Sequence, residues 1–163
     1  IDIPQGTEVN VATIYTVLPF KNTLVGLEIT GAEIKSTLED AISSVIDQKN
    51  SGSYPYSGGL RWHVDTTRSK GHRVSSIEVR QADGRYQALN LERTYRAITI
   101  EFLANGQDGF TTLQSITGDR RTEVGLDYAE AFLKYVDGLD KKDGLGQIVK
   151  LPIADYSTQS YKE

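Results

Sequence analysis

The chain has 163 residues, 38% of them hydrophobic and 25% charged, which is typical of one globular domain and excludes a disordered or fibrous chain. Its formal net charge of −4 offers no basic field to a nucleic-acid backbone, and charges interrupt every apolar run before the roughly 20 residues that a membrane span requires. Cysteine is absent, which excludes disulfides and thiolate chemistry. We therefore expect a small-molecule ligand, no nucleic-acid polymer as partner, and no membrane span.

The N-terminal stretch begins at Ile1 with no initiating Met and no signal peptide, which predicts a piece cut from a longer protein. A turn leads to Thr7, a candidate helix N-cap, so a short helix is predicted over residues 8–16, and Pro19 ends it. Leu24, Leu27 and Ile29 then predict a strand. Thr30 at its end can cap the element that follows.

Residues 32–47 show the clearest helical pattern, because their apolar residues recur at spacings of three and four and so share one face. These residues are Ile34, Leu38, Ala41, Ile42, Val45 and Ile46. The charged residues are assigned to the opposite, solvent face. They are Glu33, Lys35, Glu39, Asp40 and Asp47.

Three strands are predicted in the middle of the chain. Strict alternation over residues 60–65 predicts a strand with its apolar residues inward. Residues 74–80 and 85–89 flank Asp83-Gly84, a dipeptide suited to a type I′ turn, so they are predicted to form a β-hairpin. Residues 95–102 alternate again and predict another strand.

A second amphipathic helix is predicted near the C-terminus, and it ends within the glycine-containing stretch 138–144. Its apolar positions are Leu126, Ala129, Phe132, Leu133, Val136 and Leu139. The tail after Pro152 is expected to be extended and to fray. The predicted fold is α+β, with a mixed, largely antiparallel sheet packed with two main amphipathic helices, in a domain over residues 1–151 followed by a tail over residues 152–163.

The sequence shows no pattern typical of a metal site or of a catalytic serine nucleophile. His63 and His72 lie apart and have no acid or second histidine at ligand spacing, so we expect no metal site. No Gly-x-Ser-x-Gly elbow occurs. The segment 105–108 has only one acid, Asp108, whereas a calcium loop needs several at alternate positions. We expect no catalytic residue in this chain.

The stretch EFLANGQDGF, residues 101–110, places one acid between two glycines and two phenylalanines. The structural interpretation is that Phe20, Phe102 and Phe110 are core residues beside turns, and that Asp108 accepts hydrogen bonds within a tight loop. The functional interpretation is a nucleoside site. Two aromatic faces would clamp a base, worth about 1–3 kcal/mol per base, and the carboxylate would accept hydrogen bonds from vicinal sugar hydroxyls.

Four phrases of the sequence resemble the C-terminal domain of the 5′-nucleotidase (UDP-sugar hydrolase) family, in the family's order. They are Val17-Leu18-Pro19-Phe20-Lys21-Asn22, Leu27-Glu28-Ile29-Thr30-Gly31-Ala32-Glu33, Ser57-Gly58-Gly59-Leu60 and the segment Phe102 to Phe110. The resemblance implies a substrate-binding domain, periplasmic, secreted or at the cell surface. Its partner is a calcineurin-like N-terminal domain that holds a divalent metal pair, so this chain alone would not hydrolyse phosphate esters and needs no cofactor of its own.

The resemblance also implies roles for single residues. Phe20 and Phe102 are similar to the two aromatics that sandwich the base, Asp108 to the carboxylate that holds the ribose hydroxyls, and Asn22 to a side chain near the base edge. Gly59 is similar to a backbone element of the same pocket, with Gly58 as the alternative alignment. Phe110 is then expected in the core.

The sequence departs from the family pattern in three places. Gln107 replaces a usual glycine, which would alter the loop if that position needs positive φ, and Lys21 stands where a small residue is common. An upstream segment that supplies arginines has no match in residues 1–16. Two alternatives stay open. One is a relative that acts on cyclic nucleotides, nucleotide sugars, dinucleotides or a sulfur substrate, and the other is a scaffold module that binds no nucleoside.

Overall fold

The computed structural model describes residues 3–139, 141–142 and 145–163. Its helices are α1 (Val11–Val17), α2 (Gly31–Asp47), α3 (Glu101–Ala104), α4 (Thr111–Gln114) and α5 (Tyr128–Asp137). Its strands are β1 (Thr23–Thr30), β2 (Leu60–Asp65), β3 (Val74–Arg80), β4 (Tyr86–Ala88), β5 (Thr94–Ile100), β6 (Arg121–Asp127), β7 (Lys141–Lys142), β8 (Leu145–Gly146) and β9 (Thr158–Lys162). Single 3₁₀ turns lie at Ser51–Ser53, Gln107–Gly109, Gly118–Arg120 and Ile153–Asp155.

The strands form two main sheets. One has the order β5-β1-β6 and is antiparallel throughout. The other has the order β4-β3-β2-β9, and within it β2 and β9 run parallel while the other pairs are antiparallel. β7 and β8 form a separate antiparallel pair. This arrangement confirms the predicted α+β class with a largely antiparallel sheet.

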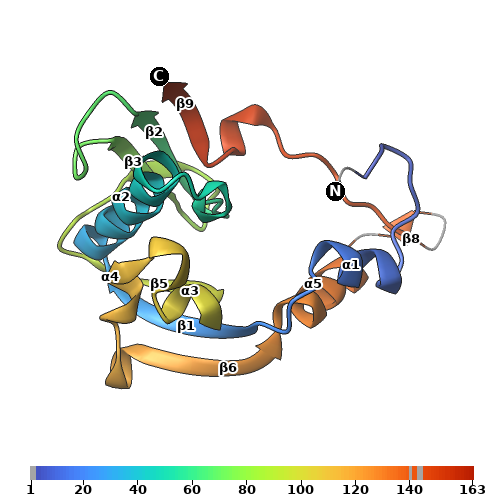
Figure 1. The fold of residues 1–163 in the computed structure, drawn as a ribbon. Coiled ribbons are helices and arrows are strands. Elements are labelled where there is room, and N and C mark those ends of the chain that lie inside the picture. Colours follow the sequence, from blue (N-terminus) through green and yellow to red (C-terminus); the bar gives the residue numbers. More distant parts are fainter. Residues whose placement is uncertain (1–2, 140, 143–144) are drawn as a thin grey trace.

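Helix α2 lies between the two sheets and organises the core (Figure 1). One of its faces packs on β1 and another on β3, and the 101–116 segment closes a third side. Buried side chains at the centre of this core are Val25, Leu27, Ile29, Leu38, Ala41, Ile42, Trp62, Val64, Val74 and Ile116. The cap predicted for this helix is confirmed, since Thr30 Oγ1 accepts from Glu33 N at 3.2 Å and Glu33 Oε2 accepts from Thr30 N at 2.8 Å.

The predicted solvent face of α2 is wrong for Glu39 and Asp40, which are buried. The sheets and the 101–116 segment surround the helix, so no face reaches water along its whole length. The Glu39 carboxylate is compensated by two backbone amides, because Oε1 accepts from Val74 N at 2.7 Å and Oε2 from Gly71 N at 2.8 Å. A buried acid is tolerated when donors saturate it in this way.

The first helix begins later than predicted. Asn10, and not Thr7, is its N-cap, because Asn10 Oδ1 accepts from Thr13 N at 3.0 Å while Thr13 Oγ1 accepts from Asn10 N at 3.4 Å. This reciprocal pair satisfies two backbone donors, which Thr7 could not do from its place in the preceding turn. The helix accordingly runs from 11 to 17.

The predicted hairpin between β3 and β4 is confirmed, but its turn is not type I′. A type I′ turn requires both central residues to have positive φ. Gly84 does, with φ +83°, but Asp83 does not. Asp83 instead uses its side chain, since Oδ1 accepts from Arg85 N at 3.0 Å and Oδ2 from Arg85 Nε at 2.8 Å. The Asp83 carboxylate thus stabilises the turn by accepting these hydrogen bonds, without a left-handed backbone at Asp83.

The strand predicted over 95–102 ends at Ile100, and Phe102 lies on the short helix α3. Alternation of Ile98, Ile100 and Phe102 is compatible with a strand, but the chain turns at Glu101, whose carbonyl accepts from Asn105 N at 2.9 Å. Three alternating residues cannot show where a strand stops. Phe110 is 7% exposed, which confirms its predicted place in the core.

The short pair β7 and β8 was not predicted, and neither were the longer strands β6 and β9. β6 pairs with β1 and includes Leu126, which the pattern had assigned to the last helix. It is an edge strand with an almost entirely exposed middle, so it lacks apolar alternation. β9 pairs in parallel with β2, so the expectation that the tail frays is wrong for residues 158–162.

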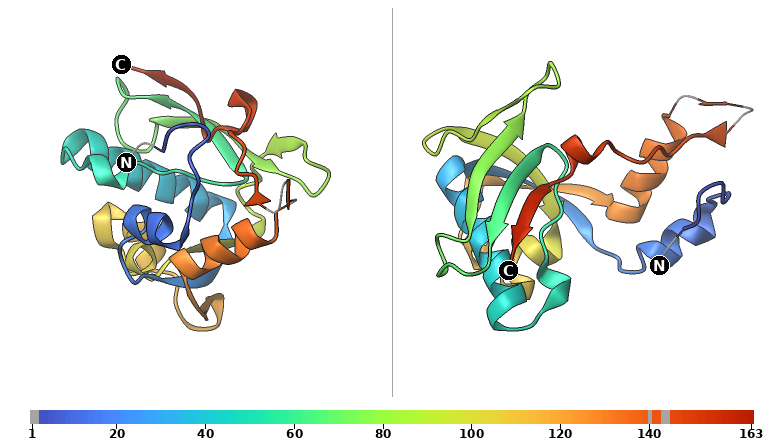
Figure 2. Two further views of the ribbon diagram at one scale, coloured as in Figure 1. Left: turned by 90° about the vertical axis from the view of Figure 1, so that its right-hand side faces the viewer. Right: turned by 90° about the horizontal axis from the view of Figure 1, so that it is seen from above.

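Helices α1 and α5 pack against each other beyond the end of the β5-β1-β6 sheet, away from α2 (Figures 1 and 2). Each buries one residue, Ile14 in α1 and Ala129 in α5. The second helix was predicted to end within residues 138–144. Helix α5 ends at Asp137 with Gly138 as its C-cap, which confirms the first residue of that stretch as the stop. Positions 140 and 143–144 of the predicted glycine-containing stop lie outside the described residues.

Candidate functional site

The antiparallel pairing of β1 with β5 brings two sequence-distant segments to one end of a sheet. Leu24 pairs with Ile100, so the residues that precede β1 meet the residues that follow β5. A hydrogen bond fixes this junction, because Thr23 Oγ1 donates to Glu101 Oε2 at 2.9 Å. Phe20 and Asn22 therefore approach α3, which bears Phe102.

The loop with Phe20 and Asn22 is held by the start of α5. Tyr128 OH accepts from Phe20 N at 3.0 Å, and the Asn22 carbonyl accepts from Tyr128 N at 3.0 Å. Asp127 caps the helix here by accepting from Ala129 N at 2.8 Å. Sequence reasoning missed Tyr128 because a tyrosine at a helix start has no distinctive spacing. Its position depends on β6, which was also missed.

The two candidate base-stacking rings are both exposed, Phe20 at 69% and Phe102 at 40%. They do not contact each other. The ring pairs among the described residues join Tyr54 with Tyr56 and with Tyr161, and Phe132 with Tyr135. On α3, the buried Ala104 anchors the helix while Phe102 is left at the surface. Because both rings are exposed at the same end of the sheet, their faces are open to a ligand.

Asp108 sits in a loop of left-handed residues. Its φ is +54°, and the flanking Gly106 and Gly109 have φ of +82° and +84°. Asp108 Oδ1 accepts from Asn50 Nδ2 at 3.2 Å, while Oδ2 has no hydrogen-bond partner among the described residues. The carboxylate is half-buried and keeps one free acceptor.

The glycines beside Asp108 allow a close approach to α2 and α4. A Cβ at Gly109 would lie 2.8 Å from Ser44 Cβ, and one at Gly106 would lie 2.9 Å from Gln114 Cβ. Both glycines also have φ values that side chains disfavour. The acid is thus presented by a loop pressed against the core. Gln107 is not among the left-handed residues, so its replacement of a family glycine does not require strain there.

Gly59 lies in the loop before β2, with φ +89° and its carbonyl accepting from Arg80 N at 2.8 Å. Its neighbours Ser57 and Leu60 line an apolar cavity of about 190 Å³ together with Leu103 and Phe110. The Gly59 loop and the Phe102–Phe110 segment therefore face each other across this cavity. Gly58 is the more exposed of the two glycines, and its carbonyl accepts from Ser57 Oγ at 3.4 Å.

The apolar cavity extends from the Gly59 loop and the Phe102–Phe110 segment to α2, whose residues Ile34 and Leu38 line it. Tyr54 forms part of its wall, and its hydroxyl shares a hydrogen bond of 2.6 Å with Thr158 Oγ1 of β9. Burial raises the pKa of the Tyr54 phenol, which keeps it neutral. Thr37 also belongs to the wall, and its buried Oγ1 has no hydrogen-bond partner in the part of the chain that the structure describes.

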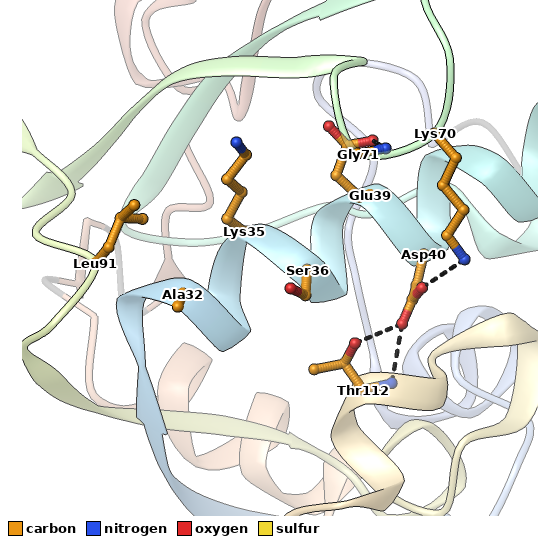
Figure 3. A pocket seen from close by; sticks show the side chains of 9 residues that line it. All are labelled: Ala32, Lys35, Ser36, Glu39, Asp40, Lys70, Gly71, Leu91 and Thr112. Atoms are coloured by element: carbon orange, nitrogen blue, oxygen red, sulfur yellow. Dashed lines mark hydrogen bonds and ion pairs between the residues drawn. The ribbon is translucent and has the colours of Figure 1, made fainter.

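A second, polar cavity of about 500 Å³ opens on α2 (Figure 3). Within it Asp40 Oδ1 pairs with Lys70 Nζ at 2.8 Å, and Oδ2 accepts from Thr112 N at 2.9 Å and from Thr112 Oγ1 at 2.6 Å. Burial by itself would raise the pKa of Asp40, but the bonds from Lys70, Thr112 and Thr111 outweigh it and lower the pKa below its usual value. The residues Phe20, Asn22, Gly59, Phe102 and Asp108 line neither cavity.

Two further findings concern metals and membranes. In the described ranges, no group of three or more histidine, aspartate or glutamate side chains is placed to hold a metal ion. His63 Nδ1 instead shares a 2.7 Å hydrogen bond with Ser160 Oγ. Among the helices that the structure describes, none is both long enough and apolar enough to cross a membrane.

The comparison with protein families decides the relationship of this chain. Residues 1–115 match the model of the family described as "5'-nucleotidase, C-terminal domain". The chain belongs to this family. The predicted resemblance is thereby confirmed, and the family description places such domains at the C-terminal end of 5′-nucleotidases.

Individual relatives agree with this membership. The chain is 34% identical over 134 residues to "Probable 5'-nucleotidase" of Treponema pallidum, covering 81% of this chain and 23% of the relative. It is 31% identical over 128 residues to "NAD 5'-nucleotidase" of Haemophilus influenzae, covering 75% and 21%. The chain thus spans less than a quarter of the length of these two relatives.

Solved structures show the same fold. The crystal structure of a 5′-nucleotidase precursor from Thermus thermophilus matches with a TM-score of 0.79 and 35% identity, over 95% of this chain and 28% of that one. The NAD nucleotidase of Haemophilus influenzae matches with a TM-score of 0.81 and 26% identity, over 95% and 27%. The α+β arrangement around α2 is therefore that of the family's C-terminal domain.

Proposed function

We propose that this chain is the nucleoside-recognising part of a 5′-nucleotidase-like metallophosphoesterase. The observation that supports it most directly is the β1–β5 pairing, which brings the loop with Phe20 and Asn22 to the helix with Phe102. Both rings are exposed, whereas Phe110 in the same segment is buried. The exposure of these two phenylalanines leaves their ring faces available for stacking on a base.

Each of the five residues has a chemical task in this proposal. Phe20 and Phe102 stack on the two faces of a base, and the Asn22 amide, which can both donate and accept, meets the base edge. Asp108 accepts hydrogen bonds from the ribose hydroxyls through its free Oδ2. Gly59 offers backbone without a side chain in the way.

The phosphate would be presented to a second domain. By the family resemblance, an N-terminal calcineurin-like phosphoesterase domain with a divalent metal pair performs the hydrolysis, in a protein that is periplasmic, secreted or attached to the cell surface. In this proposal the contribution of the present chain is orientation of the substrate toward that second domain.

A calorimetric titration of the chain with adenosine, at concentrations that detect millimolar binding, tests the proposal. We expect saturable binding that weakens about tenfold or more in the Phe102→Ala and Asp108→Ala variants, because each removes a direct contact. Tyr135→Ala is the matched control, since Tyr135 is also an exposed aromatic, at 59%, but lies on α5. Equal weakening in the control, or binding unchanged in Phe102→Ala, would contradict the proposed site.

A failure of the wild-type chain to bind adenosine would reject it as a self-sufficient nucleoside site. The same titration on a chain extended at its N-terminus by the upstream segment of the Thermus thermophilus relative, where the family resemblance implies arginines, then separates two cases. Restored binding would show that the five residues need those arginines. Continued absence of binding would favour the scaffold alternative.

A further inference from the structure

The segment that joins β8 to β9 exposes an unusual amount of apolar surface. Residues 147–154 are all exposed, and half of them are large aliphatic residues. These are Ile148 at 50%, Val149 at 79%, Leu151 at 60% and Ile153 at 79% exposure. We call residues 148–153 the apolar strip. Single exposed aliphatic residues are ordinary on protein surfaces, but a continuous run of this kind marks an interaction site.

The backbone of the apolar strip is also open to a partner. Residues 148–151 form no hydrogen bond with any described residue and belong to no helix or strand. The side chains of Ile148, Val149 and Leu151 lie outside the buried core and its packed neighbours. An extended, apolar and unpaired stretch is the kind of surface that an incoming chain segment covers, with its main chain, its side chains or both.

Both ends of the apolar strip are nevertheless anchored. On one side Gly146 lies so close to α5 that a Cβ there would meet the Val136 carbonyl oxygen at 2.7 Å. On the other side Arg61 Nη1 donates to Ala154 O at 3.2 Å, and Trp62 N donates to Ser157 O at 2.8 Å. The strip therefore connects two segments that are fixed against α5 and β2, and Figure 1 shows it running between β8 and β9.

We propose that the apolar strip is the docking surface for the phosphoesterase part of the full-length protein. This inference rests on the two-domain organisation in the proposed function. Relatives have more than three quarters of their length outside the region that matches this chain, since the chain covers 23% and 21% of them. A covalently linked domain is present at an effective concentration on the order of millimolar, which favours it over a second copy at ordinary protein concentrations.

The single charge of the apolar strip is compatible with an interface whose centre is apolar. Lys150 is the single charged residue within it, is exposed, and can extend to the rim of an interface while the four aliphatic side chains are covered. Pro152 in the strip cannot donate a backbone hydrogen bond, so side-chain packing has to supply part of the contact.

The test uses this chain and the phosphoesterase part of the Thermus thermophilus relative, produced without the region that matches this chain and checked for folding. We expect hydrogen exchange of residues 147–153 to slow when the two are mixed. We also expect the Val149→Asp/Leu151→Asp double variant to bind the phosphoesterase part at least tenfold more weakly, because it places charges in an apolar contact. Ile98→Asp is the matched control, since Ile98 is 64% exposed on β5.

Three results would overturn the inference. They are unchanged exchange in the strip on mixing, equal weakening by Ile98→Asp, and protection of the strip by self-association of the chain alone, which light scattering would detect. The outcome is separable from the nucleoside proposal, because adenosine titration of the chain does not involve the strip. The double variant should therefore keep the wild-type response to adenosine.

Discussion

Helices α2 and α5 are both amphipathic in sequence, yet they have different surroundings in the fold. α2 lies between two sheets and buries residues on several sides, including the acids Glu39 and Asp40. α5 packs on α1 and β6 and buries Ala129. The same periodicity thus leads to a largely buried helix in one place and a mostly exposed helix in the other. The number of neighbouring elements, and not the helix pattern, sets the burial.

This difference divides the molecule into two regions with separate roles. The α2 region holds the continuous hydrophobic core and presses on the loop of Asp108 through Ser44. The α1–α5 region has little buried apolar surface, and the apolar strip leads away from it. We expect stability to depend mainly on the first region and contacts with other parts of a longer protein to depend on the second.

The largest expected effect is in the α2 core. Ile42→Ala should lower the free energy of unfolding by about 2–5 kcal/mol, because Ile42 is 1% exposed and its loss leaves a cavity. Tyr135→Ala on α5 should change it by about 0.5 kcal/mol or less, since Tyr135 is mostly exposed. Urea denaturation followed by circular dichroism measures both. Similar losses in the two variants would erase the contrast between the helices.

A smaller effect is expected from the acids of the two helices. Asp40→Asn should cost about 1–3 kcal/mol, because Asp40 is buried and accepts from Lys70, Thr111 and Thr112. Glu130→Gln on α5 is the control. Its ion pair with Lys134, at 3.3 Å, is exposed and contributes at most about 0.5 kcal/mol.

The Asp40 contribution should also depend on pH. Its folded-state pKa is lowered, so its stabilisation is complete above the unfolded-state pKa of about 3.9 and is lost as pH falls through the folded value. The difference in unfolding free energy between wild type and Asp40→Asn should therefore persist at pH 7 and shrink below about pH 4. A gap that widens on acidification would show that the carboxylate is not stabilised in its ionised form.

The smallest effect compares two glycines with nearly equal backbone angles. Gly109→Ala and Gly59→Ala both place a side chain at left-handed φ, which costs about 1–2 kcal/mol. Gly109 additionally faces Ser44 at 2.8 Å, whereas nothing lies within 4 Å of a Cβ at Gly59. Gly109→Ala should be the more destabilising, by thermal unfolding. Equal melting temperatures would mean that the Asp108 loop can move away from α2.

Local signals predicted much of the fold. The predicted Thr30 cap and the spacing of apolar residues located α2 almost to the residue, because both signals arise from neighbours in sequence. β6 and β9 escaped prediction because edge strands with exposed residues have no apolar alternation. Their presence depends on pairing with β1 and β2, to which no nearby residue points.

The candidate site shows the same division. The resemblance located Phe20, Asn22, Gly59, Phe102 and Asp108, whose roles stay predictions. Neither pattern nor resemblance indicated Tyr128, which holds the Phe20 loop, or Asn50, which binds Asp108. Both contacts join residues more than 50 positions apart, as their separations of 108 and 58 show.

The sequence by itself determined the helix caps, the amphipathic helices, the hairpin and the membership of a family, because these follow from short-range interactions or from short phrases of sequence. The tertiary structure alone decided which charged residues are buried, where β5 ends, and which aromatic rings reach the surface. Those outcomes depend on what packs against each element. In the case of α2 this is two sheets and a loop contributed by distant parts of the chain.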